Sequence, residues 1–432
     1  MLTLVSNDLP SAQPEDLGFS RERLVNIDKF YGDKVAKGEM AGIVVLIARH
    51  GKVAHFSAIG YADLGSKRKM DQNTVFRIHS MTKPIAATAL MMLYEEGKFQ
   101  LADPISKYIP EFAGVRVLRA SEAPIADTVP AIREPTIHDL FRHTAGLGHG
   151  VVQREGVPTN SAIDAAYLEA DLFGVDTSLA DMMKKLSQIP LRYQPGTKFE
   201  YSIGPDIQAR LVEILSGMSF DQFLQRRLFR PLAMKDSGYW VKDPSRLAAV
   251  HWWKEGRIVP CDDAHGYPDP TSFLLEAANI NSYTNDNAHK GGSYGLVGTA
   301  TDYWRFAQMM LNGGELEGQR ILGRNTVRYM ARDHLGAVSI PDATGAPSGM
   351  GFGLGFAVLK DPVAIGVIGS EGSFFWFGAA NTLFWIDPKE DIVVVAMTQH
   401  MGPSLPASWL LYSQLSAMVY GALGRVTDPN IK

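Results

Sequence analysis

The chain has 432 residues, of which 46% are hydrophobic and 20% charged, and its 42 basic and 46 acidic residues leave a net charge of -4. This composition is ordinary for a globular protein, and the length allows two or three structural units. The small net charge gives no reason to expect a nucleic-acid partner. The one cysteine, Cys261, excludes an intrachain disulfide and any multi-cysteine metal site, and it fits a reducing compartment.

No stretch of the sequence is typical of a targeting or membrane-spanning segment. The first residues, MLTLVSNDLPSAQPEDLGF, lack a basic start, and only their first five could pass for the apolar region of a signal peptide, so we expect none. The longest apolar runs, at 40–48 and 392–397, are short of the roughly 20 residues that a transmembrane helix needs. We therefore expect a cytoplasmic protein without a membrane span.

The first part of the chain predicts a helix and a β-hairpin. Apolar residues one helical turn apart between 21 and 38, with charges between them, predict an amphipathic helix that ends at Gly38 and lies on a sheet. β-branched runs on either side of RHGK at 49–52 predict two antiparallel strands. Two prolines within 101–112 predict an irregular connection.

The middle of the chain predicts helices followed by long loops. TIHD at 136–139 is a weaker relative of the capping box and opens a helix that stops at HTAG, 143–146. His143 could act as a general base, although a histidine hydrogen-bonded in a loop is the commoner meaning. Residues 240–290 are rich in Asp, Asn, Gly and Pro and predict loops. Further helices are predicted at 179–189, 206–216 and 220–229.

The last third of the chain predicts one helix and then mostly strands. The helix is capped at Thr299 or Thr301 and closes at the glycine pair 313–314. A final helix is predicted at 406–423. The β-rich runs between these helices lie at 353–359, 364–369, 379–386 and 392–398.

Strands near both ends of the chain, with helices between them, predict one antiparallel sheet built from the two chain ends. On this basis we divide the chain into a sheet domain and an inserted lobe. The sheet domain comprises 1–100 and 291–432, and the inserted, mostly helical lobe with long loops comprises 101–290.

The stretch 75–98, VFRIHSMTKPIAATALMMLYEEGK, predicts an apolar helix with a reactive pair at its start. Ser80 is a plausible N-cap, and Gly97 suits the left-handed end of the helix. Because Ser80 and Lys83 are three residues apart, the Lys83 amine can approach the Ser80 hydroxyl. The apolar residues that follow predict burial, which favours a neutral amine able to take the hydroxyl proton. On the motif alone, a capping serine and a solvated lysine remain the commoner meaning.

GGSYG at 291–295 offers a second candidate nucleophile, Ser293. It matches the G-x-S-x-G elbow of the α/β-hydrolases, which needs a buried strand before the serine and a helix directly after it. Here residues 279–290 are polar and rich in Asn, and the next helix begins only beyond Gly298. We therefore favour Ser80 over Ser293.

Three motifs in order give Ser80 further weight: SMTK at 80–83, YS at 201–202 and WFG at 376–378. They resemble the penicillin-binding and class C β-lactamase superfamily of serine hydrolases, most closely its family VIII carboxylesterases. Looser matches are LADP at 101–104, HTAGL at 143–147, PGT at 195–197 and GLVGTA at 295–300. The resemblance implies an α+β fold of the β-lactamase/transpeptidase type, an antiparallel sheet flanked by helices with an inserted helical lobe.

The resemblance also implies roles for particular residues. Ser80 would be the nucleophile, with Lys83 and Tyr201 as base and proton relay. The backbone N–H groups of Ser80 and Ala379 would form an oxyanion hole for the tetrahedral intermediate.

Two departures from the β-lactamase motifs bear on the substrate. WFG stands where the lactamases have Lys-Thr-Gly, so Trp376, Phe377 and Gly378 would line an aromatic substrate wall in place of a cationic subsite. Ile203 stands where the motif Tyr-x-Asn has its amide. Both departures argue against efficient β-lactam hydrolysis and against recognition of cell-wall peptides.

We therefore expect a serine carboxylesterase that hydrolyses short-chain, neutral carboxylic esters through an acyl-enzyme on Ser80, with no metal or cofactor. The partner would be a small-molecule ester, and the oligomeric state stays open. Alternatives within the superfamily are a β-lactamase, a D-amino-acid amidase or a transesterase. A penicillin-binding module that acylates without turnover is an alternative of a different class.

Overall fold

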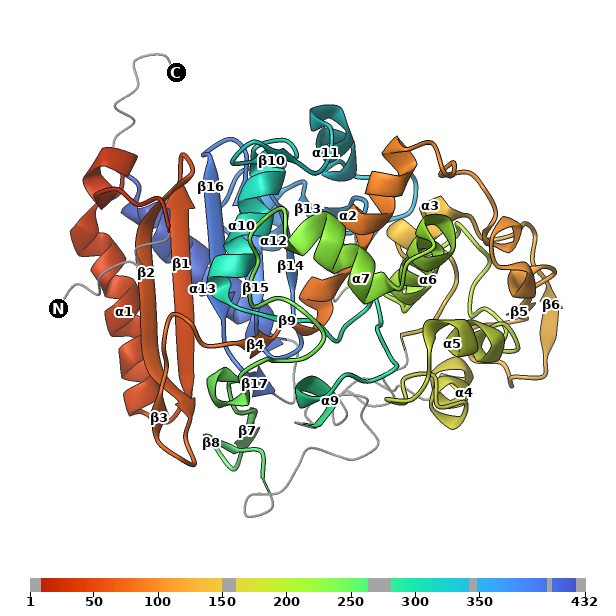
Figure 1. The fold of residues 1–432 in the computed structure, drawn as a ribbon, viewed down its shortest axis with the longest axis horizontal. Coiled ribbons are helices and arrows are strands. Elements are labelled where there is room, and N and C mark those ends of the chain that lie inside the picture. The colour runs from red at the N-terminus through yellow and green to blue at the C-terminus, as the bar shows by residue number, and fades with distance from the viewer. Residues whose placement is uncertain (1–8, 150–160, 263–280, 342–347, 402–405, 425–432) are drawn as a thin grey trace.

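An eight-stranded antiparallel sheet built from both ends of the chain organises the fold (Figure 1). The computed structural model describes residues 9–149, 161–262, 281–341, 348–401 and 406–424. In spatial order the strands are β12 (Met350–Phe352), β13 (Ala357–Leu359), β14 (Phe374–Phe377), β15 (Leu383–Asp387), β16 (Ile392–Met397), β1 (Gly42–Arg49), β2 (Lys52–Asp63) and β3 (Arg68–Lys69). The predicted sheet is therefore confirmed.

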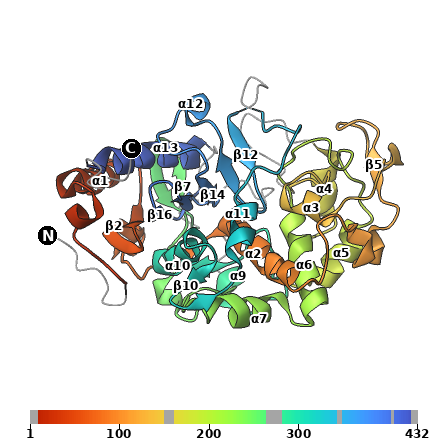
Figure 2. The ribbon, with the colours of Figure 1, turned by 90° about the horizontal axis from the view of Figure 1, so that it is seen from above.

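Helices cover both faces of the sheet, which explains why its central strands are apolar throughout. Figure 2 shows α1 (Arg21–Ala36) and α13 (Pro406–Ala422) on one face and α10 (Ala300–Leu311) on the other. In β1, Ile43, Val45 and Ile47 pack in the cluster on the α1 side, and the alternate residues pack in the cluster on the α10 side. This division follows from the two-residue period of a strand.

The predicted β1–β2 hairpin is confirmed, and its turn has a clear local cause. His50 and Gly51 have φ values of 54° and 71°. Two consecutive left-handed residues make the type of turn that fits the twist of a two-stranded ribbon.

The helical part of the chain packs against α2 (Thr82–Glu95), whose closest helical neighbour is α6 (Gly204–Ser216). One hydrophobic cluster runs from β1 through α2 to α6. The division at residues 100 and 291 stays a prediction. The other helices of this region are α3 (Ile137–Phe141), α4 (Ala162–Glu169), α5 (Leu179–Leu186) and α7 (Phe220–Leu224), which continues as the π-helical turn η5 (Gln225–Phe229).

Short elements complete the described part of the chain. The short helices are η1 (Pro14–Leu17), η2 (His79–Met81), η3 (Ile105–Lys107), η4 (Pro110–Phe112), η6 (Pro244–Arg246), α9 (Asn281–Thr284), α11 (Arg324–Met330) and α12 (Pro362–Ile365). The short strands are β4 (Phe76–Arg77), β5 (Arg116–Leu118), β6 (Thr128–Pro130), β9 (Val297–Gly298), β10 (Glu315–Leu316) and β11 (Gln319–Arg320). Across all the residues that the structure describes, no helix is long and apolar enough to cross a membrane.

The strand predicted at 364–369 is wrong, because this segment begins in the short helix α12. Pro362 stands at the first helical position, and the Asp361 carboxylate accepts the N–H groups of Val363 and Ala364. Gly366, with φ of 75°, ends the helix. Capping chemistry thus overrides the β-branched residues of the segment.

Three other predictions need correction at turns. Of the run predicted at 353–359, only 357–359 is a strand (β13), because Gly355 (φ 92°) lies in the turn that connects it to β12 at 350–352. The run at 379–386 becomes extended only at Leu383, since Asn381 (φ 58°) lies in a turn after β14. Within 240–290, predicted as loops, the structure contains a hairpin around a turn at 255–256. Its strands are β7 (His251–Lys254) and β8 (Arg257–Pro260), and β17 (His400–Met401) pairs with β7.

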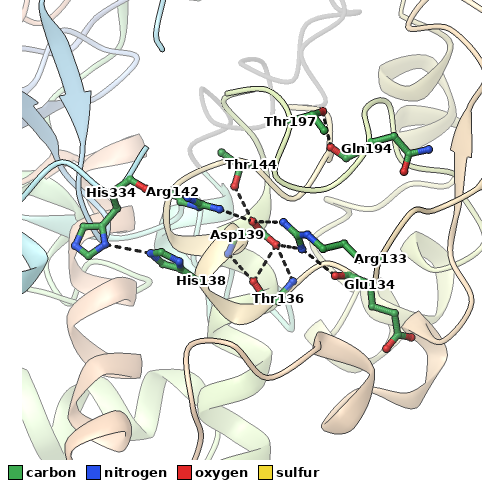
Figure 3. Close-up of polar contacts among 10 residues, drawn as sticks. All are labelled: Arg133, Glu134, Thr136, His138, Asp139, Arg142, Thr144, Gln194, Thr197 and His334. Atoms are coloured by element: carbon green, nitrogen blue, oxygen red, sulfur yellow. Dashed lines mark hydrogen bonds and ion pairs between the residues drawn. The ribbon is translucent and has the colours of Figure 1, made fainter. Parts of the chain in front are cut away.

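The buried carboxylate of Asp139 holds the start of α3 and the turn that follows this helix (Figure 3). It accepts the backbone N–H of Thr136 at 2.9 Å and completes a full capping box with that residue. It also accepts hydrogen bonds from Arg133 at 2.6 and 3.0 Å, from Arg142 at 3.1 Å and from Thr144 at 2.9 Å. One carboxylate therefore fixes both ends of this short helix.

A histidine pair links α3 to the chain that enters the edge strand β12 (Figure 3). His138 Nε2 lies 3.1 Å from His334 Nδ1, and Arg142 donates to the His334 carbonyl at 2.9 Å. Burial, followed by the charge of Arg142, lowers the pKa of His138 to about 4. A neutral pair can share one hydrogen bond without repulsion, so the contact holds the helical region against the sheet edge at neutral pH.

Burial by itself would raise the pKa of Asp139, but hydrogen bonds from Arg133 and Thr136 outweigh it and hold this pKa well below its usual value. A lowered pKa in the folded state means that the ionised carboxylate stabilises the fold at every pH above the unfolded value of about 4. The stabilisation is lost as the pH falls from there toward the folded pKa.

We expect Asp139→Ala to lower the free energy of unfolding at pH 7 by about 3 to 5 kcal/mol, because it leaves buried donors and two arginines without their acceptor. Denaturant titration measures this loss, and the difference from the unmutated protein should shrink below about pH 4. Asp127→Ala is the control: it removes an exposed carboxylate paired with Arg119, which should cost about 1 kcal/mol or less. Equal losses in the two variants would contradict the anchoring role of Asp139.

Candidate active site

Ser80 lies in a tight turn between β4 and α2, partly exposed at the junction of the sheet and the helices. The expectation that Ser80 caps the helix is wrong: it belongs to the 3-10 turn η2, and Met81 occupies the capping position without a side-chain bond. The cause is His79, whose φ of 44° turns the chain just before Ser80. Left-handed backbone is uncommon for a residue other than glycine, so this turn is strained. The predicted end of α2 at Gly97 (φ 70°) is present.

Lys83 points from the first turn of α2 to the Ser80 hydroxyl. Its Nζ lies 3.1 Å from Ser80 Oγ and 2.8 Å from the backbone carbonyl oxygen of Ser293. The residue is only 3% exposed, and its Nζ also sits 4.7 Å from the centre of the Tyr201 ring. A buried amine held by a carbonyl and a ring face, with no carboxylate partner among the described residues, is suited to exchange a proton with the hydroxyl beside it.

Ser293 contributes its backbone to this arrangement. Its carbonyl accepts from Lys83, and its N–H donates to Asp206 Oδ1 at 3.0 Å. Its own hydroxyl is buried without a hydrogen-bond partner in the described structure. The segment before it is irregular, so the strand that a nucleophile elbow requires is missing there.

Tyr201 stands beside Lys83 but directs its hydroxyl toward the aromatic wall. The Trp376 indole N–H donates to the Tyr201 hydroxyl oxygen at 3.2 Å, and the two rings are 5.2 Å apart. Since the oxygen accepts from Trp376, the phenolic proton stays available to another acceptor. The rings of His143 and His149 lie 4.8 and 4.7 Å from the Tyr201 ring and fix its plane.

His143 has a structural role, as expected for a histidine that is hydrogen-bonded in a loop. It is 2% exposed with φ of 55°, and its Nδ1 accepts the Ser202 N–H and lies 3.0 Å from Ser202 Oγ. Burial lowers its pKa well below the ordinary value, so the ring is neutral at physiological pH. It packs against Tyr201 and contacts neither Ser80 nor Lys83 through a hydrogen bond in the described residues.

The end of β14 lies directly against the turn that carries Ser80. A Cβ atom at Gly378 would fall 2.5 Å from the Ile78 carbonyl oxygen, so only glycine permits this approach. Ala379 follows in the turn, partly exposed. Among the described residues, neither the Ser80 N–H nor the Ala379 N–H donates a hydrogen bond. Both backbone donors are thus without an acceptor in the described structure.

The aromatic wall is larger than the motif WFG indicates. Trp376 is partly exposed and packs edge-on to Phe352 of β12 at 5.3 Å, and Phe352 in turn contacts Phe199 at 5.4 Å. Phe199 and Phe352 were not predicted, because neither belongs to a motif, although Phe199 lies between PGT and YS. Ile203 is 1% exposed and packs in the hydrophobic core, so its side chain adds no polar group to the site.

A small hollow lies next to the Ser293 segment, lined by residues that include Tyr239, His289, Lys290 and Tyr294. Its volume is about 40 Å³. A cavity needs about 10 to 15 Å³ to hold one water molecule. It therefore has room for water.

Comparison with known proteins supports the fold and gives the family of the chain. The sequence matches the Beta-lactamase family over residues 27–416. Protein Rv1367c of Mycobacterium tuberculosis (strain ATCC 25618 / H37Rv) is 33% identical over 84% of this chain and 86% of its own length. Esterase EstB of Burkholderia gladioli is 27% identical over 86% of this chain and 89% of its own length.

Solved structures agree with the family match. EstCE1, described as a hydrolase with promiscuous acyltransferase activity, superposes with a TM-score of 0.75 at 26% identity, covering 94% of this chain and 99% of its own. Simvastatin synthase LovD from Aspergillus terreus has a TM-score of 0.73 at 17% identity over 94% of this chain and 100% of its own, and so shares the fold. This chain therefore belongs to the β-lactamase family of hydrolases and has an esterase among its relatives.

Proposed function

We propose that this protein is a serine carboxylesterase that hydrolyses short-chain, neutral carboxylic esters through an acyl-enzyme on Ser80. The observation that carries the proposal is the 3.1 Å contact between Lys83 Nζ and Ser80 Oγ, made by a lysine that is only 3% exposed. The esterase among its relatives, EstB, supports an ester as the substrate.

In the proposed acylation step, Ser80 Oγ attacks the ester carbonyl carbon and its proton passes to the Lys83 amine. A neutral amine can keep one N–H on the Ser293 carbonyl while its lone pair accepts this proton. The carbonyl oxygen becomes an oxyanion, and the free N–H groups of Ser80 and Ala379 would stabilise it. When the intermediate collapses, the proton goes to the departing alcohol, and the acyl group stays on Ser80.

Tyr201 would act in the same proton path as a relay. Its hydroxyl oxygen accepts the Trp376 N–H, so its own proton is free to be donated toward the leaving oxygen. In deacylation the direction reverses: a water molecule loses a proton to the base, attacks the acyl carbon and releases the acid, which restores the Ser80 hydroxyl.

The substrate preference follows from the aromatic wall. Trp376 replaces the lysine of the lactamase motif and is surrounded by Phe352 and Phe377. Apolar groups gain roughly 25 cal/mol per Å² on burial there, whereas a carboxylate would lose its hydration without a charged partner. We therefore assign neutral esters rather than β-lactams as substrates.

Transfer of the acyl group to an alcohol is a second candidate, because EstCE1 is described as having promiscuous acyltransferase activity. It uses the same acyl-enzyme and differs only in whether water or an alcohol accepts the acyl group.

Ser80→Ala should abolish hydrolysis of p-nitrophenyl esters, whereas Ser293→Ala should keep most of it. The reason is that only Ser80 has a base in contact with its hydroxyl, while Ser293 serves through backbone atoms that alanine retains. Steady-state rates measure this, and mass spectrometry of a fluorophosphonate adduct should locate the label on Ser80. Full activity of Ser80→Ala would refute the mechanism.

Lys83→Ala and Tyr201→Phe should each lower kcat by about 10² to 10⁴, with little change in KM, since proton transfer contributes in that range. Lys69→Ala and Tyr61→Phe are matched controls, because Lys69 of the edge strand β3 also sits over a tyrosine ring, that of Tyr61 in β2, at 3.9 Å. Both controls should keep the activity of the unmutated enzyme. If Tyr201→Phe stays within about twofold of that activity, Tyr201 has a packing role and Lys83 acts alone.

We expect kcat/KM for short-chain p-nitrophenyl esters to exceed kcat/KM for penicillins or cephalosporins by at least about 10²-fold. This ratio is the one expected when a β-lactam carboxylate loses one charge-assisted contact of around 3 kcal/mol. Trp376→Lys should narrow the ratio without producing an efficient lactamase, because Ile203 still lacks the amide. Trp376→Phe, which keeps an aromatic wall, should retain the preference for esters. Comparable efficiency on both substrate classes in the unmutated enzyme would contradict the assignment.

A further inference from the structure

We propose that Asp206 is a positioning residue for catalysis, which aims the Lys83 amine at Ser80 by fixing the backbone of Ser293. This inference rests on the proposed function, since it assigns Lys83 as the base. It concerns a residue that lies outside the motifs of the site and that the mechanism above does not use.

The connection runs through two hydrogen bonds. Lys83 Nζ donates to the Ser293 carbonyl at 2.8 Å, and the Ser293 N–H donates to Asp206 Oδ1 at 3.0 Å. The segment around Ser293 is irregular until β9 begins at Val297, so no strand pairing fixes the direction of its carbonyl. The hydrogen bond from the Ser293 N–H to the Asp206 carboxylate fixes this direction instead.

Asp206 is itself held rigidly. It lies in the first turn of α6, where the helix N-terminus favours a negative charge, and it is 0% exposed. The Ser293 segment lies directly on this turn, because a Cβ at Gly292 would fall 2.0 Å from the Pro205 carbonyl oxygen. Since α6 begins three residues after Tyr201, the same element supports both the base and the proposed relay.

The surroundings of Asp206 show that its second oxygen is not used by the fold. In the described structure, neither Asp206 Oδ2 nor His289 Nε2 has a hydrogen-bond partner, although both are buried. The Asp206 carboxylate and the His289 ring border one small space, because the Cβ that Gly291 lacks would lie 2.6 Å from Asp206 Oδ1 and 2.7 Å from His289 Nε2. His289 is near enough for the charge of Asp206 to act on it, but no hydrogen bond joins the two side chains among the described residues. The Ser293 N–H is the hydrogen-bond donor that the Asp206 carboxylate has among the described residues.

Loss of the Asp206 acceptor should therefore act on the chemical step. The Ser293 N–H would lose its partner, and its carbonyl would no longer hold Lys83 Nζ against Ser80 Oγ. The aromatic wall of Trp376 and Phe352 belongs to the sheet and would keep its geometry. Substrate binding should consequently change little, while kcat falls.

The test compares Asp206→Ala with Asp206→Asn on a short-chain p-nitrophenyl ester. We expect Asp206→Ala to lower kcat by about 10- to 100-fold with KM within about twofold, the range for a misplaced catalytic group. Asp206→Asn keeps an oxygen that can accept the Ser293 N–H, and it should recover kcat to within about fivefold of the unmutated enzyme.

Asp302→Ala is the matched control. It removes another buried carboxylate from the first turn of a helix, α10, where Asp302 accepts the Asp236 N–H and the Ser237 hydroxyl, both at 2.8 Å. It should lower the melting temperature and leave kcat per folded molecule unchanged. A loss of kcat per folded molecule as large in Asp302→Ala as in Asp206→Ala would overturn the proposal, and so would an Asn variant as inactive as the Ala variant.

Gly291→Ala provides a second approach that keeps the carboxylate and so does not depend on the folding of Asp206→Ala. The added methyl group would displace Asp206 Oδ1 and His289 Nε2 and should lower kcat in the same way. Gly32→Ala, at a helical site with open space around the new Cβ, is its control. An unchanged kcat in Gly291→Ala would overturn the positioning role. Ser80→Ala, run in parallel, tests the proposed function separately: activity in that variant would reject the mechanism whatever Asp206 does.

Discussion

The burial of one amine, that of Lys83, is the constraint on which the site depends. A lysine that is 3% exposed and has no carboxylate partner in the described structure needs other polar atoms around it, and it finds the Ser80 hydroxyl, the Ser293 carbonyl and the face of the Tyr201 ring. These groups come from three distant parts of the chain. The helix that carries Lys83 lies between the sheet and the helical region, so the amine can be satisfied only when both are packed against it.

Two buried carboxylates hold the helical side of this arrangement. Asp139 fixes both ends of α3 and, through Thr144, the turn that contains His143. His143 packs on the Tyr201 ring and accepts the Ser202 N–H. Asp206, in the first turn of α6, holds the Ser293 segment by accepting its N–H. Because hydrogen bonds to buried carboxylates are directional, such networks can hold catalytic groups more tightly than apolar packing does.

The sheet side of the site combines close backbone approach with an aromatic surface. Gly378 lets the end of β14 touch the Ile78 backbone, which brings the Ala379 N–H toward the turn of Ser80. Trp376, on the same strand, places an indole where related lactamases have an ammonium group, and its N–H engages the Tyr201 hydroxyl. A single substitution relative to the lactamase motif thus changes both the charge offered to a substrate and the hydrogen bonding of the proposed relay.

The sequence by itself determined the sheet from both chain ends, the β1–β2 hairpin, most helices and the three motifs of the site, because each depends on short-range periodicity, turn residues or spacing. Only the tertiary structure decided that Ser80 sits in a strained turn rather than at a helix cap, and that 364–369 begins in a helix. The Ser293 carbonyl on Lys83 and the Asp206 carboxylate behind it also emerged only there. These contacts join segments about 90 to 210 residues apart. Sequence patterns describe side chains, so they cannot predict which backbone carbonyl will accept a hydrogen bond.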